Sequence, residues 1–237
     1  YLWNNPLFEY MKKRLTVMER HGIDYSVITY SANVVQIIDS AADQVHTKAD
    51  IVSDLNRRTH EAILAHPAKT GATGWIDLRL GSSALDEMEA VSDWVLGYSV
   101  LSGYEIGGQM KMLDDPEFSP FWQKAAELEK PIFIHFSSRF PVSTAEHALP
   151  GYMNNSMLNA GMGQLMENSL CLSRLVLSGL FDKFPSLKVV MGQLGGMYPL
   201  MLERFEMLYT MHLKGAAAKG LCVTDPENLS GFMRNYK

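Results

Sequence analysis

The sequence predicts an α/β protein built on a parallel β-sheet. Two observations carry this prediction. Five short segments rich in apolar and β-branched residues are typical of strands, and each is followed by a segment with the apolar periodicity of a helix. Strands that alternate regularly with helices pair in parallel, because each crossover helix returns the chain to the same end of the sheet. The alternation by itself leaves open whether the sheet is open or closed into a barrel.

A predicted helix precedes the first strand. Asn5-Pro6 supplies an N-cap and a first-turn proline, and apolar residues then recur at helical spacing until His21-Gly22 ends the helix. The predicted strands are 25–29, 72–78, part of 98–106, 131–135 and 187–191. The predicted helices after them are 47–65, 83–97, 117–129, 156–180 and 197–212, with an irregular loop over 137–155.

The composition limits the class of protein. The formal net charge is -5 and no block of basic residues is present, so nucleic acid is not an expected partner. We expect neither a signal peptide nor a membrane span, since no apolar run reaches the about 18 residues that a span needs. Cys171 and Cys222 lack metal-binding spacing and are predicted to be reduced, buried thiols of a cytoplasmic protein. One domain is expected over residues 1–237.

A glycine-rich corner follows the last predicted strand. Gly192, Gln193, Gly195 and Gly196 lie at the carboxyl end of that strand, which is where ligands and catalytic groups collect in parallel α/β proteins. The glycines allow a sharp turn and the close approach of a ligand. Gln193 is the polar side chain that we expect to point into this mouth.

His135 is the strongest candidate for a metal ligand. It ends the apolar segment Pro131–Ile134, so its imidazole is predicted to lie at the carboxyl end of a strand. The alternative is a buried histidine that hydrogen-bonds to a loop carbonyl.

Several motifs together resemble one family. They are the pattern from Arg14 to Asp24, the segment DDPEFSPFW at 114–122, the PIFIH strand at 131–135, and the stretch GLFDKFPSLKVVMGQLGGMYPLMLERF at 179–205. This combination resembles the amidohydrolase-related metal-dependent enzymes, a family that includes 2-amino-3-carboxymuconate-6-semialdehyde decarboxylase. The resemblance covers nearly the whole chain.

The resemblance implies a (β/α)8 TIM barrel. In that frame residues 131–135 correspond to strand five, 187–193 to strand six and 25–29 to strand two. Strands one and eight are then absent from this chain, which would leave two unpaired edges in a barrel. We therefore expect the natural gene product to be longer.

The resemblance also implies a divalent metal, usually zinc. Family members hold it with an H-x-H or E-x-H pair on strand one, the histidine of strand five and an aspartate of strand eight. His135 is the one member of that set that this sequence supplies, and it contains no H-x-H. The remaining ligands are expected outside this chain.

Gln193 departs from the family pattern, which has a histidine at this position as general acid and base. A histidine exchanges a proton near neutral pH, whereas a carboxamide does not. Gln193 is therefore the candidate catalytic residue in an altered role: it could orient a water or a substrate carbonyl through its donors and its acceptor. The alternative is that it only packs the turn.

Three further residues are candidates for substrate binding. Arg204 matches a family arginine that reaches a substrate carboxylate, including across a dimer interface, and its guanidinium suits a bidentate carboxylate. The alternative for Arg204 is a surface ion pair with Glu203 or Glu206. Arg139 is a second carboxylate candidate, and Phe136 is predicted to wall an apolar pocket. Met162 and Met166 are interpreted more simply as helix-core packing.

The function that the resemblance implies is non-oxidative decarboxylation of an aromatic or muconate-like carboxylic acid by a cytoplasmic homodimer. Two alternatives stay open. One is a metal-dependent hydrolase of an ester, lactone or amide, because a fold does not determine its chemistry. The other is a degenerate, non-catalytic member of the family, favoured by Gln193 and the missing ligands.

Overall fold

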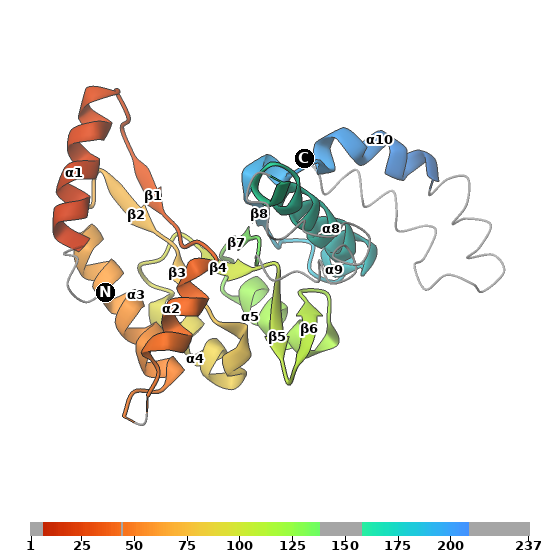
Figure 1. Cartoon of the computed structure of the whole chain (residues 1–237), viewed down its shortest axis with the longest axis horizontal. Helices are drawn as coiled ribbons and strands as arrows, with labels where there is room; N and C mark the ends of the chain where they lie inside the picture. The colour runs from red at the N-terminus through yellow and green to blue at the C-terminus, as the bar shows by residue number, and fades with distance from the viewer. Residues whose placement is uncertain (1–6, 44, 138–157, 209–237) are drawn as a thin grey trace. The chain divides into compact units, whose positions relative to one another are not determined.

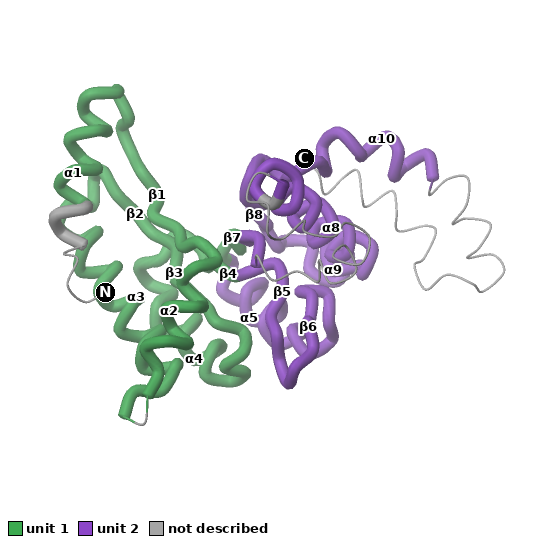
Figure 2. The backbone as a smooth tube through the Cα atoms, in the orientation of Figure 1, with its two compact units in different colours: residues 1–100, 130–133 green, residues 101–129, 134–237 purple. Residues whose placement is uncertain are grey.

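The computed structural model describes residues 7–43, 45–137 and 158–208 of the chain. The chain divides into two compact units (Figure 2). Unit 1 comprises residues 1–100 and 130–133, and unit 2 comprises residues 101–129 and 134–237. None of the described helices is long and apolar enough to cross a membrane.

Unit 1 begins with a helix whose apolar spacing sets its buried face. The elements are α1 (Leu7–Arg20), β1 (Ser26–Ile28), α2 (Asn33–Ala41), α3 (Lys48–Leu64), β2 (Thr70–Ala72), β3 (Gly74–Trp75), the 3-10 turn η1 (Leu78–Leu80) and α4 (Ser82–Val91) (Figure 1). Met11 and Met18 of α1 are both buried, and Gly22 follows the helix with a φ of 65°, which favours glycine. The predicted first helix and its end are confirmed.

Helix α3 is held at its start and at its middle. Thr47 and Asp50 form a capping box, in which each side chain accepts a hydrogen bond from the backbone N–H of the other residue. Asn56, fully buried, accepts a 2.8 Å hydrogen bond from the Trp75 N–H and donates a 3.0 Å bond to the Trp75 carbonyl. A buried carboxamide on the helix thus satisfies both backbone groups of one residue of β3.

The strand pairs of defined register confirm a parallel α/β structure. β1 runs parallel to β2, with Ser26 opposite Thr70, and β3 runs parallel to β4 (Tyr98–Leu101), with Gly74 opposite Tyr98. A four-stranded sheet has the order β3-β4-β7-β8. All four residues of β4 are buried, as expected for a strand covered on both faces.

Unit 2 carries the carboxyl ends of β4 and β7. Its elements continue with β5 (Gly103–Ile106), β6 (Gln109–Met112), the 3-10 turn η2 (Pro116–Phe118), α5 (Ser119–Glu127), β7 (Ile132–His135), the π-helical turn η3 (Asn159–Gly163), α8 (Gln164–Leu177), α9 (Leu180–Lys183), β8 (Val189–Met191), the 3-10 turn η4 (Gln193–Gly195) and α10 (Tyr198–Leu208). Gly179, with a φ of 76°, separates α8 from α9. The predicted helix over 156–180 therefore ends earlier, at Leu177.

Two features were not predicted from the sequence, namely helix α2 and the β5–β6 hairpin. Helix α2 is only 9 residues long, so its apolar periodicity spans too few turns to be distinctive. Strands β5 and β6 form an antiparallel hairpin, which Figure 1 shows as two adjacent arrows. Its turn is Gly107-Gly108, with φ values of 60° and 75°, which is a recognisable hairpin signal. The predicted strand over 72–78 is also wrong in extent, because its segment is divided between β2, β3 and η1.

The expected core role of two methionines is wrong. Met162 is 50% exposed and Met166 is 46% exposed, although both belong to a helical segment rich in apolar residues. Polar residues on α8 are buried instead: Glu167, Asn168, Ser169 and Ser173. The buried face of α8 is therefore partly polar.

Candidate active site

The carboxyl ends of β4, β7 and β8 come together within unit 2. Ser102, the residue after β4, donates its backbone N–H to the His135 carbonyl at 2.8 Å. Gly192, the residue after β8, donates its N–H to the Ile134 carbonyl at 2.9 Å. The predicted metal ligand and the predicted glycine-rich corner are thus neighbours at one end of the sheet.

His135 is half-buried, and one of its ring nitrogens already has a partner. Its Nδ1 lies 2.9 Å from the Phe136 carbonyl oxygen, which accepts the hydrogen bond, so Nδ1 carries the proton and Nε2 keeps its lone pair. Burial lowers the pKa of His135, against smaller opposing effects of the Phe136 carbonyl and of Glu167. The neutral imidazole, which is the form that binds metals, is therefore favoured. Both earlier interpretations of His135 are compatible with this geometry.

Glu167 joins the ends of β4 and β7. Its Oε1 accepts hydrogen bonds from the Ser102 hydroxyl, from the Ser137 backbone N–H and, at 2.7 Å, from the Ser137 hydroxyl. Glu167 is only 6% exposed, and a carboxylate is costly to bury unless hydrogen-bond donors compensate it. Glu167 thereby fixes the backbone two residues beyond His135.

Asn168 joins the same helix to the corner after β8. Its Nδ2 donates to the Gly192 carbonyl at 3.0 Å and to Gln193 Oε1 at 2.6 Å. The Gly192 carbonyl also accepts the Gly195 N–H at 3.0 Å. A carbonyl can only accept, so it is the amino group of Asn168 that faces it, and the orientation of the Asn168 amide is determined.

Asn168 adds little net stability. Its Oδ1 is buried and has no hydrogen-bond partner among the residues that the structure describes, which costs about 1–3 kcal/mol. Its two hydrogen bonds contribute about 0.5–1.5 kcal/mol each. Because these amounts nearly offset one another, the residue is better explained by what it positions than by the stability it adds.

Ser169 completes a run of three buried polar residues on α8. Its hydroxyl accepts the Met197 N–H at 2.8 Å and donates to the Leu165 carbonyl at 2.6 Å. Gly196 lies against the same turn of helix, and a Cβ placed on it would be 2.3 Å from the Leu165 carbonyl oxygen. Gly196 also has a φ of 65°, so both sterics and backbone conformation require glycine here.

Gln193 is exposed, and its backbone is unusual. Gln193 has a φ of 46° and Leu194 a φ of 57°, values that non-glycine residues rarely adopt. Strain of this kind persists where surrounding contacts determine it, and it clusters at binding sites. Asn168 supplies such a contact through Gln193 Oε1.

The remaining predicted site residues have different outcomes. Phe136 is 8% exposed, and its ring packs on the His135 ring at 4.1 Å between centroids. Arg204 is exposed on α10, and no ion pair with Glu203 or Glu206 is found within the described part of the chain. Arg139 lies outside the described residues. The assigned roles of all these residues stay predictions.

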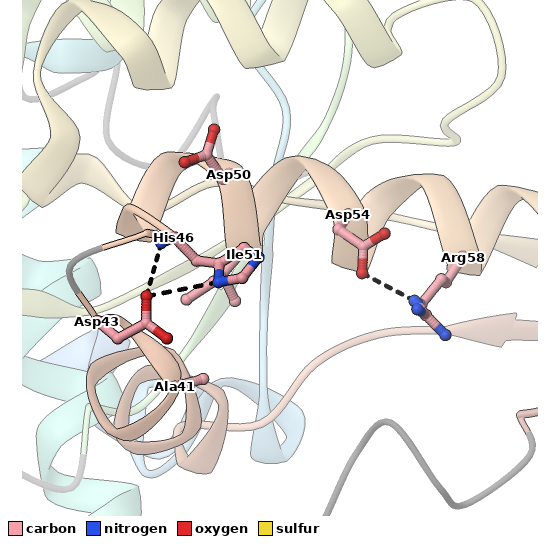
Figure 3. A pocket seen from close by; sticks show the side chains of 7 residues that line it. All are labelled: Ala41, Asp43, His46, Asp50, Ile51, Asp54 and Arg58. Carbon is pink, nitrogen blue, oxygen red and sulfur yellow. Dashed lines mark hydrogen bonds and ion pairs between the residues drawn. The ribbon is translucent and has the colours of Figure 1, made fainter.

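A separate hollow lies in unit 1, between the end of α2 and the first half of α3 (Figure 3). It measures about 680 Å³, and its lining includes Asp43, Asp50 and Asp54. Each carboxylate is already engaged: Asp43 by the Val45 and His46 N–H groups, Asp50 by Thr47, and Asp54 by Arg57 and Arg58. Because the three carboxylates already bind groups of the same helix or of the preceding turn, we assign no ligand to the hollow.

Comparison with known proteins decides the family. The family model described as Amidohydrolase matches residues 2–220. The chain belongs to the amidohydrolase family. The resemblance inferred from the sequence motifs is thereby confirmed.

Among curated relatives of this amidohydrolase chain is gamma-resorcylate decarboxylase of Rhizobium sp., which is 26% identical over 204 residues, or 84% of this chain and 60% of the relative. Another is the 2-amino-3-carboxymuconate-6-semialdehyde decarboxylase of Dictyostelium discoideum, 23% identical over 81% of this chain and 50% of the relative. The chain thus spans about 60% or less of the length of these relatives.

Solved structures agree with this assignment. The 2,6-dihydroxybenzoate decarboxylase complexed with 2,6-dihydroxybenzoate has a TM-score of 0.68 and 26% identity, covering 81% of this chain and 58% of that one. The 5-carboxyvanillate decarboxylase of Sphingomonas paucimobilis has a TM-score of 0.70 and 25% identity, covering 91% and 61%. A dihydroxybenzoic acid decarboxylase of Polaromonas sp., solved with bound manganese and 2-nitroresorcinol, shares the fold at a TM-score of 0.68, with 21% identity over 81% of this chain and 57% of that one.

The described residues do not by themselves fit a catalytic metal. A catalytic zinc site commonly has three protein ligands and an open position. Within residues 7–43, 45–137 and 158–208, no group of three or more His, Cys, Asp and Glu side chains could hold a metal ion. His135 is one candidate ligand, and its Nε2 has no hydrogen-bond partner among these described residues.

The residues that connect the strand ends of this site were not predicted from the sequence. Glu167, Asn168 and Ser169 are three consecutive polar residues in a helix that is rich in leucine. Three consecutive residues span about 200° of a helix, so one of them is normally exposed. The tertiary structure buries all three at 6% exposure or less.

Proposed function

We propose that the protein containing this chain is a metal-dependent, non-oxidative decarboxylase of an aromatic carboxylic acid. The observation that carries the proposal is the family match together with relatives named as decarboxylases of resorcylate and dihydroxybenzoate, at 26% identity. The arrangement of His135 beside Gln193 at the carboxyl ends of β7 and β8 supports it, because active sites in parallel α/β folds lie at that end.

The chemistry defines what the residues of this chain can contribute. Decarboxylation replaces the bond from the ring carbon to the carboxylate by a bond to hydrogen, so carbon dioxide leaves and a proton must reach that carbon. Gln193 cannot supply this proton at neutral pH, because a carboxamide does not titrate there. Its proposed role is to hold a polar group of the substrate. His135 is proposed as a metal ligand through Nε2, and a bound divalent cation would supply charge stabilisation.

Arg204, Arg139 and Phe136 are proposed substrate contacts. The exposed guanidinium of Arg204 suits a carboxylate, on the same chain or on a second copy in a homodimer. Phe136 is 8% exposed and packs its ring on His135, and it is proposed as an apolar wall of a pocket for a planar aromatic acid. Arg139 is proposed for the same carboxylate on sequence grounds alone.

The finer features of the family are part of the same proposal. We propose that the complete protein forms one (β/α)8 barrel, of which the described strands are a part, and that it acts in the cytoplasm as a homodimer. Zinc is the proposed metal. Manganese is the alternative, because the Polaromonas structure was solved with it.

The test is metal-dependent release of carbon dioxide. The purified protein, prepared as its full natural product, is freed of metal, reloaded with Zn²⁺ or Mn²⁺, and incubated with 2,6-dihydroxybenzoate or 5-carboxyvanillate. We expect carbon dioxide release that requires the metal, and a loss of at least 100-fold with His135→Ala, because losing a first ligand removes both charge and geometry. Elemental analysis of the same samples should show less bound metal in the variant.

Two outcomes would overturn the proposal. Hydrolysis of a lactone or ester, with no carbon dioxide from either acid, would assign the protein to the hydrolases. A folded, full-length protein that binds no metal and turns over neither class would be a non-catalytic member. His21→Ala, the same change at an exposed position in unit 1, is the matched control and should leave turnover unchanged.

A further inference from the structure

The side-chain amide of Gln193 has a defined orientation. Asn168 turns its amino group to the Gly192 carbonyl at 3.0 Å, and the same Nδ2 donates to Gln193 Oε1 at 2.6 Å. The oxygen of Gln193 is therefore committed to the helix, and its own backbone carbonyl accepts the Gly196 N–H at 2.9 Å. What remains of this exposed residue for a ligand is Nε2, which has two N–H donors and no acceptor.

No described residue accepts a hydrogen bond from Gln193 Nε2. A neutral donor at this place pairs with an acceptor oxygen, and hydrogen bonds to ionised acceptors are about twice as strong as those between neutral groups. Of the groups on an aromatic carboxylic acid, the carboxylate is the ionised acceptor, whereas a phenol is both donor and acceptor. The donor at Gln193 Nε2 therefore favours the carboxylate of the acid over its phenol groups.

We propose that Gln193 binds the carboxylate of the substrate through Nε2 as a hydrogen-bond donor, and that Asn168 is the positioning residue that fixes this polarity. The inference rests on the proposed function for the identity of the ligand. The orientation of the Gln193 amide is independent of the proposed function, because it follows from the Gly192 carbonyl. In this account the position where the family has a proton-transfer histidine is used for substrate recognition.

The first test compares an isosteric change with its control. Gln193→Glu keeps an oxygen for Asn168 and replaces the donor by a negative charge. Calorimetric binding of 2,6-dihydroxybenzoate to the metal-loaded protein should weaken at least 10-fold, whereas binding of resorcinol, which lacks the carboxylate, should stay within twofold. Gln36→Glu, the same chemical change at an exposed position on α2, should leave both affinities unchanged. Unchanged binding of the acid, or equal loss for both ligands, would overturn the proposal.

The second test isolates Asn168. Asn168→Ala should weaken binding of 2,6-dihydroxybenzoate about 3-fold to 10-fold in the natural background, and should add nothing to Gln193→Ala, because the amide it positions is then gone. A purely structural role would weaken binding equally in both backgrounds, and that result would reject the positioning role.

A third measurement needs no ligand and no variant of Asn168. Side-chain amide proton exchange is followed by NMR, with the Gln193 signals assigned from their loss in Gln193→Ala. We expect protected Asn168 Nδ2 protons and rapidly exchanging Gln193 Nε2 protons; the reverse pattern would contradict the assigned polarity. If the natural protein binds neither ligand, the proposed function fails, and this measurement still decides the orientation of Gln193.

Discussion

The Ser137 hydroxyl donates a 2.7 Å hydrogen bond to Oε1 of Glu167, a residue 30 positions later in the chain. The same oxygen accepts the Ser102 hydroxyl and the Ser137 N–H, so one buried carboxylate connects the ends of β4 and β7 beside His135. Glu167 is thus a structural support for the candidate ligand and is not itself part of the proposed chemistry.

We predict that Glu167→Ala destabilises the protein by about 2–4 kcal/mol, because hydrogen bonds to a charged group contribute about 1.5–3 kcal/mol and their buried donors would be left unpaired. Glu167→Gln keeps an acceptor oxygen and should cost less. Urea unfolding of both variants tests the order. Equal stabilities of the natural protein and the alanine variant would contradict this account of the contact.

A second prediction concerns the ion pairs of Arg79 in unit 1. Its guanidinium contacts Asp77, which is fully buried, and also donates to Asp39 at 2.9 Å. Arg79→Met leaves the Asp77 carboxylate buried without its counter-charge, which costs about 3–5 kcal/mol. Arg79→Lys retains a positive charge but loses the planar guanidinium donors. Its stability should therefore lie between that of the natural protein and that of Arg79→Met. Thermal unfolding gives the ranking, and a methionine variant as stable as the lysine variant would be inconsistent with the pairing.

Two glycines with the same positive φ provide a comparison of their surroundings. Gly22 and Gly196 both have a φ of 65°, but only at Gly196 would an added Cβ meet other atoms within 4 Å. Gly22→Ala should cost about 1–2 kcal/mol, the penalty of the left-handed conformation. Gly196→Ala adds an overpacking cost of about 1–3 kcal/mol against the Leu165 carbonyl. Differential scanning calorimetry should therefore show the larger fall in melting temperature for Gly196→Ala; the opposite order would refute the close approach.

The acid stability of unit 1 should depend on Asp39. Burial raises the pKa of Asp39, but hydrogen bonds from Arg79 and Lys48 outweigh burial and hold the pKa below its ordinary value of 3.8. The unfolded chain then takes up the proton at a higher pH than the folded one. The stabilisation is fully present well above pH 3.8 and is lost as the pH falls through that value towards the lower folded pKa.

Asp39→Asn removes this titration. The difference in unfolding free energy between the natural protein and Asp39→Asn should be larger at pH 7 than at pH 3.5, as measured by urea unfolding at both values. A difference independent of pH would mean that the carboxylate does not gain from Arg79 and Lys48.

Cys171 should be inert in the folded protein. Its thiol is fully buried, and burial raises its pKa far above the ordinary value, so the reactive thiolate is not populated at neutral pH. Iodoacetamide should label the Cys171 peptide only after unfolding, as read by mass spectrometry. Rapid labelling under native conditions would show that α8 opens.

The sequence alone predicted the class of structure and the strand ends at which the candidate site lies. The alternation of strand and helix segments depends on local periodicity, and the strands that end at His135 and before Gln193 were located within a few residues. The family motifs between 14 and 205 identified the family for the same reason, because their residue spacing is contained in the chain itself. Short elements such as α2 were missed because too few residues repeat the pattern.

Only the tertiary structure showed which side chains connect the strand ends at the candidate site. Glu167 and Asn168 are adjacent in sequence, yet they bind segments that come 65 positions earlier and 24 positions later. Their burial depends on which face of α8 packs against the sheet ends, and periodicity favoured the methionine face instead. The polarity of Gln193 likewise follows from a carbonyl and an amide that meet only in the folded chain, which no local pattern encodes.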